Sequence, residues 1–172
     1  TTSSSKDEIN WYLPTEISTL DISKVTDSYS SIAIGNSGSN LLRRDKNGDL
    51  QPDLAAKDIE VSDDGLTYTA TLRDNLKWSD GSDLTAEDFV YTWQRIVDPK
   101  TASEYAYLVS DAHVLNAEEV INGTKSVDEL GVKADGTKVS FTLSSPSPQF
   151  MSSFSFTNFM PQSKAFVEKT GD

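Results

Sequence analysis

Residues 55–93, which read AAKDIEVSDDGLTYTATLRDNLKWSDGSDLTAEDFVYTW, constrain the fold more than any other stretch of the sequence. Apolar and polar residues alternate from Ile59 to Val61 and again from Tyr68 to Leu72. Between these runs, residues 63–65 read Asp-Asp-Gly, a common turn composition. Alternation on both sides of such a turn is typical of a β-hairpin, so the first half of the stretch predicts one.

The second half predicts an amphipathic helix. Thr85 stands where an N-cap is expected, and Asp88 follows three positions later, as in a capping box. Apolar residues then recur at helical spacing: Phe89, Val90, Trp93, Ile96 and Val97. The pair Asp98-Pro99 should end the helix. We expect Trp78 and Trp93 to be buried in the core.

The remaining sequence predicts short elements around this centre. A short apolar run at residues 9–13, closed by Pro14, predicts a strand, and apolar spacing over residues 29–42 favours a helix. A second hairpin is expected at residues 132–143 around Asp135-Gly136. Asn116 is a candidate N-cap for a short helix over residues 117–122.

Two further patterns are turns. Residues 45–49, Asp-Lys-Asn-Gly-Asp, cluster oxygen-bearing side chains, but their spacing departs from a calcium loop, so Asn47-Gly48 predicts a hairpin turn. Ser126 and Glu129 repeat the capping-box pattern, and Gly131 should end that short turn. The aromatic-rich segment 150–160 is expected to pack against another part of the structure.

Composition excludes several classes of function. The formal net charge is -12 and the pI is about 4.4, which argues against nucleic acid or an anionic membrane surface as a partner. The chain has no cysteine and one histidine, His113, which has no nucleophile motif beside it. We therefore predict no catalytic residues, no metal site and no cofactor, and hence no enzyme.

Three consecutive segments carry a family resemblance: V-S-D-D-G-L-T-Y-T, L-R-D-N-L-K-W-S-D-G and L-T-A-E-D-F-V-Y-T-W. Together they closely resemble the signature of the family 5 extracellular solute-binding proteins. Leu20-Asp21 is similar to the family's L-D-P element, with Ile22 in place of the proline. Further segments resemble the oligopeptide-binding branch: Trp93-Gln94-Arg95, Thr101-Ala102-Ser103, residues 130–134 and residues 160–166.

The resemblance implies an α/β fold with α+β character, in which β-hairpins and packed helices form the N-terminal part of a two-lobed, periplasmic-binding-protein-like structure. It implies the following division: a flexible tether (1–8), the start of lobe I (9–42), an inserted subdomain carrying the signature (43–148) and a return segment into lobe I (149–172). In an N-terminal fragment, residues 150–160 would lose part of their packing partner and could be left exposed.

The resemblance also implies an extracellular receptor that delivers oligopeptides to the permease subunits of an ABC importer, by lobe closure and without chemistry. Relatives act at the outer face of the cytoplasmic membrane, held by a lipid anchor on a cysteine that this chain lacks, or in the periplasm. A monomer is expected. Two alternatives stay open: a family member that binds a peptide pheromone or a nickel chelate, and a surface adhesion or interaction module.

Four residues are candidates for ligand contact through the resemblance. Tyr105 stands where oligopeptide-binding relatives carry a tyrosine that touches the peptide. Thr26, Asp27 and Ser28 stand where relatives pair by backbone with the ligand, a form of β-augmentation. The alternative is that all four are ordinary surface residues. Because the peptide of relatives lies between two lobes, this chain is expected to hold one wall of the site.

Overall fold

The computed structural model describes residues 10–170; the expected tether over residues 1–8 lies outside them. The helices are α1 (Ser28–Ser37), α2 (Ala86–Val97), α3 (Ala106–Asp111), α4 (Ala117–Ile121), α5 (Phe150–Ser153) and α6 (Lys164–Thr170), with 3₁₀ turns η1 (Val127–Glu129) and η2 (Thr157–Phe159). The strands are β1 (Leu42–Arg44), β2 (Leu50–Pro52), β3 (Glu60–Val61), β4 (Thr67–Thr71), β5 (Val132–Asp135) and β6 (Lys138–Thr142). This mixture confirms the expected α/β class with α+β character.

Four strands form one antiparallel sheet in the order β3-β4-β6-β5. The two hairpins expected from the sequence supply its two halves, so both are confirmed. The halves join where β4 pairs with β6, which places Tyr68 opposite Phe141 and Ala70 opposite Val139. All four side chains are buried. Because alternate residues of a strand share a face, these side chains line the core face of the sheet.

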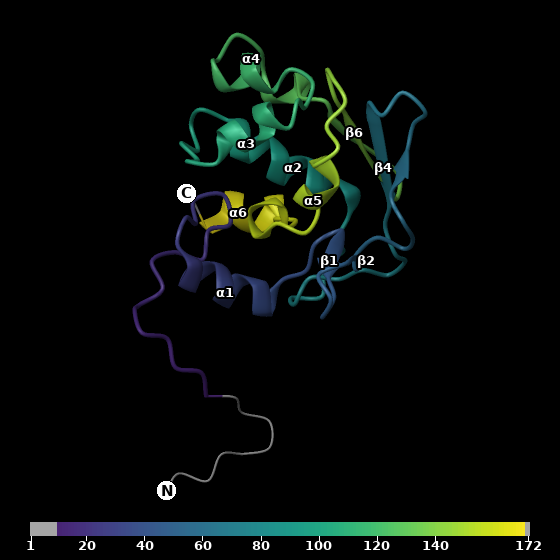
Figure 1. Ribbon diagram of the computed structural model, residues 1–172. Coiled ribbons are helices and arrows are strands. Elements are labelled where there is room, and N and C mark those ends of the chain that lie inside the picture. Colours follow the sequence, from purple (N-terminus) through teal and green to yellow (C-terminus); the bar gives the residue numbers. More distant parts are fainter. Residues whose placement is uncertain (1–9, 171–172) are drawn as a thin grey trace, which may run out of the picture.

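Helix α2 covers this face and contacts β5 and β6. Its predicted apolar stripe is buried: Phe89, Val90, Trp93, Ile96 and Val97. Thr85 is the N-cap, as predicted, and its backbone N–H donates to Asp88 Oδ2 at 2.9 Å. On its other side α2 contacts α3 and α4, so it lies between these helices and the sheet (Figure 1).

Aromatic rings fill the space beside Trp93. The ring of Trp93 stacks on Phe159 with centroids 4.2 Å apart and an interplanar angle of 11°. The other rings in contact with Trp93 are Phe141, Phe150 and Phe154. Segment 150–160 therefore contributes three buried rings to the core of this chain and is not left exposed as a whole. Trp93 and the sheet give it an internal partner.

Helix α1 is shorter than the helix predicted over residues 29–42. It stops before Gly38, where a Cβ would lie 2.9 Å from the sulfur of Met160. Leu42 instead begins β1, which pairs with β2 in a hairpin. The turn of this hairpin contains Asn47-Gly48, as predicted, and Gly48 has a φ of +89° that suits glycine.

The strand predicted over residues 9–13 is wrong for the part that the structure describes. Residues 10–13 form no strand, and the side chains of Trp11 and Tyr12 are 65% and 84% exposed. An apolar run becomes a strand only where another edge supplies hydrogen bonds, and none of the strands within residues 10–170 pairs with it.

Asn116 precedes α4, as predicted, but its side chain does not cap the helix. The residue has a left-handed backbone with a φ of 65°, and its Nδ2 donates to the carbonyl of Glu129 at 2.6 Å. Asn116 thereby ties α4 to η1. Among residues 10–170, no helix is both long enough and apolar enough to cross a bilayer.

Candidate functional site

Thr26–Ser28 connects a turn at residues 21–25 to helix α1. Asp27 is the N-cap of that helix, and its Oδ1 accepts the backbone N–H of Ser30 at 2.8 Å. Its Oδ2 accepts the hydroxyl of Ser18. Hydrogen bonds from Ser18 and from Ser30 lower the pKa of Asp27 to about 2. The carboxylate of Asp27 is thus occupied in starting the helix.

The backbone of Thr26 is the most open polar surface of this segment. Thr26 is exposed, and within residues 10–170 neither its N–H nor its C=O has a hydrogen-bond partner. The carbonyl of Asp27, in contrast, accepts both the N–H and the hydroxyl of Ser31. Ser28 is exposed and begins α1. Backbone pairing with a ligand stays a prediction here, with Thr26 as its best-placed member.

Tyr105 lies in a different part of the surface, at the N-terminus of α3. It is half-buried, and its ring meets Phe156 edge-on with centroids 6.0 Å apart. The two rings line a hollow of about 410 Å³ that is also bordered by Tyr107 and Leu108. An aromatic hollow of this kind can take an apolar side chain, while the tyrosine hydroxyl offers a polar contact.

The 3₁₀ turn η2 and its flank connect the two candidate regions. On one side Phe156 packs on Tyr105. On the other side the Nδ2 of buried Asn158 donates to the carbonyls of Ile22 and Val25, at 2.8 and 3.0 Å. Sequence reasoning missed Asn158, because a single asparagine within an aromatic-rich segment carries no motif.

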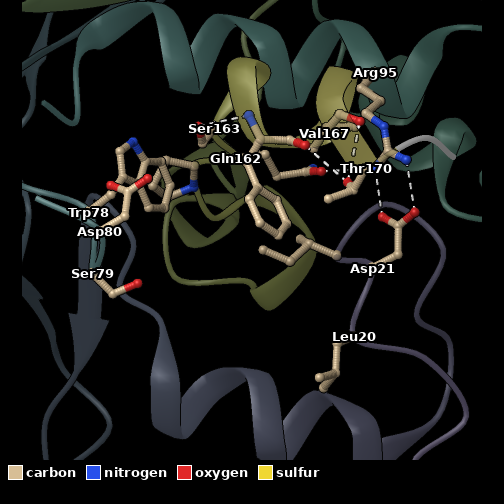
Figure 2. A pocket seen from close by; sticks show the side chains of 13 residues that line it. Leu20, Asp21, Trp78, Ser79, Asp80, Arg95, Gln162, Ser163, Val167 and Thr170 are labelled. Atoms are coloured by element: carbon tan, nitrogen blue, oxygen red, sulfur yellow. Dashed lines mark hydrogen bonds and ion pairs between the residues drawn. The ribbon is translucent and has the colours of Figure 1, made fainter. Parts of the chain in front are cut away.

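A second hollow, of about 500 Å³, opens beside the turn at residues 21–25 (Figure 2). Apolar side chains including Leu20 and Phe166 border it, and Trp78 forms part of its wall. The prediction that Trp78 is buried in the core is therefore wrong. Trp78 is partly exposed because its indole lies at the edge of the core. The indole Nε1–H donates to Asp88 Oδ2 at 3.2 Å.

Arg95 and Asp21 form the polar floor of this second hollow, where Figure 2 shows them facing each other. Arg95 is buried, and its Nη1 and Nη2 donate to the two oxygens of Asp21 at 2.6 and 2.8 Å. Nη1 also donates to Gln162 Oε1 at 2.8 Å. Burial alone would raise the pKa of Asp21, but the hydrogen bond and charge of Arg95, together with the backbone N–H of Ser23 and the charge of Lys24, outweigh it and lower that pKa.

The network continues into the turn itself. Gln162 Nε2 donates to the hydroxyl of Ser23 at 2.8 Å, and both residues are buried. The carbonyl of Asp21 accepts the N–H groups of Lys24 and Val25. Asp21 and Gln162 lie in segments that resemble the family. The resemblance therefore draws attention to both residues, but it does not predict which residues they contact.

The single histidine of the sequence, His113, borders neither hollow. His113 is exposed, and its own backbone is left-handed, with a φ of 61°. Among the residues from 10 to 170, no three His, Cys, Asp or Glu side chains are close enough to hold a metal ion. What the geometry offers is a free backbone edge, an aromatic hollow and a buried polar network, which together suit the binding of a flexible polar ligand.

Comparison with known proteins decides the family. The family model described as "Bacterial extracellular solute-binding proteins, family 5 Middle" matches residues 49–172. This chain belongs to that family. The family 5 signature spans β3 to α2, so the elements that build the core also carry the family match.

Relatives of this family 5 protein include the dipeptide-binding protein of Lactococcus lactis subsp. cremoris, 46% identical over 98% of this chain and 30% of that protein. Among solved structures, the substrate-binding domain of an oligopeptide ABC transporter from Bacillus anthracis superposes with a TM-score of 0.87 and 42% identity. It covers 91% of this chain and 30% of the solved chain. Listeria monocytogenes OppA bound to peptide gives a TM-score of 0.86 and 36% identity, with the same coverage of 91% and 30%. The chain thus spans about 30% of the length of these three proteins.

Proposed function

We propose that this chain forms the N-terminal part of an extracellular receptor that captures oligopeptides and delivers them to an ABC importer. Its mechanism is binding followed by closure of two lobes, a hinge motion without covalent chemistry. The observation that carries the proposal is the superposition on Listeria monocytogenes OppA bound to peptide, with a TM-score of 0.86 over 91% of this chain.

Thr26–Ser28 and Tyr105 are the proposed contacts of this chain with the peptide. The free N–H and C=O of Thr26 can pair with a peptide main chain, whatever its side chains. The hollow beside Tyr105 can take a peptide side chain, and the ring of Tyr105 can stack on a peptide bond. Main-chain pairing combined with a tolerant hollow suits a receptor that accepts many sequences.

We further propose that residues 9–42 begin lobe I, residues 43–148 form the inserted subdomain and residues 149–172 return to lobe I. The rings of Phe150, Phe154 and Phe159 support a firm attachment of the return segment, since they pack into the core beside Trp93. The receptor acts as a monomer outside the cytoplasmic membrane, lipid-anchored or periplasmic, with permease subunits as its partners. It needs no cofactor and is not an enzyme.

A chimeric receptor tests this proposal. Residues 1–172 would replace the matching 30% of Listeria monocytogenes OppA, and calorimetry with a pool of mixed oligopeptides would measure binding. We expect saturable binding that Tyr105→Ala weakens about tenfold, as for a single aromatic anchor. Tyr12→Ala is the control, since Tyr12 is 84% exposed and borders neither hollow. A folded chimera that shows no saturable heat change, absorbed or released, at two temperatures would refute the proposal.

A further inference from the structure

Side chains from elsewhere in the chain hold the segment 21–28 against the rest of the fold. Within residues 10–170 it contains no strand, and only its last residue is helical. A loop without secondary structure is fixed only by the contacts that its backbone and side chains make. Some of these contacts lie within the turn, where the carbonyl of Asp21 accepts the N–H groups of Lys24 and Val25. The others come from α2 and from the segment around η2, both of which are anchored in the aromatic core.

Three buried side chains make these contacts. Arg95 binds the carboxylate of Asp21 through two hydrogen bonds, and Gln162 bridges Arg95 to the hydroxyl of Ser23. Asn158 donates to two backbone carbonyls, those of Ile22 and Val25. The turn at residues 21–25 is therefore held at both ends and at its middle. We call Arg95, Asn158 and Gln162 the polar clamp.

The clamp ends one residue before Thr26. Val25, whose carbonyl Asn158 holds, is fully buried, whereas Thr26 is exposed with both backbone groups free. From there Asp27 fixes the start of α1. The free edge of Thr26 thus lies between two fixed points, and its direction is set before any ligand arrives. Such preorganisation raises affinity because less conformational freedom is lost on binding.

The same short segment also carries the other proposed contact. Asn158 holds the turn, while Phe156, two residues earlier, packs against Tyr105. The distance between the Thr26 edge and the Tyr105 hollow is therefore set through η2. We propose that Arg95, Asn158 and Gln162 are positioning residues for peptide binding, which hold the Thr26 backbone at a fixed place relative to Tyr105. This inference rests on the proposed function.

Site-resolved NMR on the isotope-labelled 172-residue chain tests the inference, with a mixed tripeptide pool at millimolar concentration as the probe. Below saturation, the peptide-induced shift of an amide signal is proportional to affinity. We expect shifts at Thr26–Ser28 in the unaltered chain. In Asn158→Ala they should fall about tenfold at the same peptide concentration, which corresponds to about 1.4 kcal/mol. Ser23→Ala is a milder change, since it removes only the hydroxyl that accepts the hydrogen bond from Gln162 Nε2, and it should lower them about threefold to fivefold.

A control separates positioning from a general loss of stability. Val132→Ala truncates a fully buried side chain of β5, which is not part of the clamp. It should destabilise the chain and leave the shifts at Thr26–Ser28 unchanged at a temperature where all variants are folded. Should Asn158→Ala fail to fold, Ser23→Ala carries the test alone.

The possible failures differ. Shifts at Thr26–Ser28 that persist unchanged in Asn158→Ala and Ser23→Ala would overturn the clamp and leave peptide binding standing. Equal losses in Val132→Ala would also overturn it, because stability alone would then explain the effect. An unaltered chain without any shift at Thr26–Ser28 would overturn the proposed contact and the clamp together.

Discussion

The indole of Trp93 lies parallel to the ring of Phe159, with the two centroids 4.2 Å apart and the planes 11° from parallel. This contact joins α2 to a segment more than sixty residues later in the chain. It also places the signature helix directly against η2, from which Asn158 reaches the turn before Thr26 and Phe156, the residue before η2, reaches Tyr105. The core and the proposed binding surface therefore share one aromatic attachment.

Trp93→Ala should destabilise the fold severely. It removes a fully buried indole and leaves a cavity beside Phe159 and the three other rings that contact it. We expect a loss of about 3–5 kcal/mol in the free energy of unfolding, measured by urea denaturation. Trp11→Ala, at a side chain that is 65% exposed, should change it by less than about 0.5 kcal/mol. Similar losses for both would contradict this core.

Gly131 should resist substitution for a steric reason. A Cβ at this position would lie 2.7 Å from both the Cβ of Leu115 and the carbonyl oxygen of Thr142. Gly131→Ala should therefore cost about 1–3 kcal/mol, as overpacking does. Gly35→Ala is the matched control, because nothing lies within 4 Å of its Cβ, and within α1 it should stabilise by up to about 1 kcal/mol. A higher Tm for Gly131→Ala than for Gly35→Ala would contradict the close approach of Leu115 and Thr142 to Gly131.

Asp88 has two partners at the start of α2. Its Oδ2 accepts the backbone N–H of Thr85 at 2.9 Å and the indole N–H of Trp78 at 3.2 Å. Asp88→Ala should cost about 1–2 kcal/mol and lower the Tm by a few degrees. Glu87→Ala, an exposed acidic residue in the same turn, should cost less than about 0.5 kcal/mol. Equal losses in Asp88→Ala and Glu87→Ala would contradict the role of Asp88 in capping this helix.

The carboxylate of Asp27 should make the start of α1 sensitive to acid. Its pKa is held at about 2, below the ordinary value of 3.8. Because the folded value is the lower one, ionised Asp27 stabilises the fold above about pH 4, and this contribution disappears as the pH falls to about 2. The difference in unfolding free energy between the unaltered chain and Asp27→Asn should shrink over that range. A carboxyl pKa near 3.8, measured by NMR titration, would contradict the hydrogen bonds from Ser18 and Ser30.

The elements that sequence predicted best are local. The hairpins and α2 are specified by alternation, turns and caps within a few residues of one another, so their prediction needs no knowledge of the rest of the chain. The misplaced Trp78 shows the limit of this reasoning. An aromatic residue at an apolar position is buried only if the surrounding elements close over it, and here they leave one side open.

Contacts between distant residues could not be predicted. Arg95 and Asp21 are 74 positions apart, and Asn158 and Val25 are 133 positions apart. Nothing in the local sequence around either partner announces such a pairing. The candidate residues Thr26–Ser28 and Tyr105 came from family resemblance alone. The structure adds what resemblance lacks: that Thr26 has a free backbone, and that η2 ties its segment to Tyr105.

Peptide affinity, measured by calorimetry on the 172-residue chain and on the chimeric receptor side by side, tests the central proposal most directly. A peptide enclosed between two lobes is buried on both sides, whereas the Thr26 edge and the Tyr105 hollow alone leave water to compete for each hydrogen bond. We predict submicromolar binding by the chimera and binding at least about 100-fold weaker by the chain alone, a difference of about 2.8 kcal/mol. Submicromolar binding by residues 1–172 alone would contradict the proposal that they hold one wall of the site.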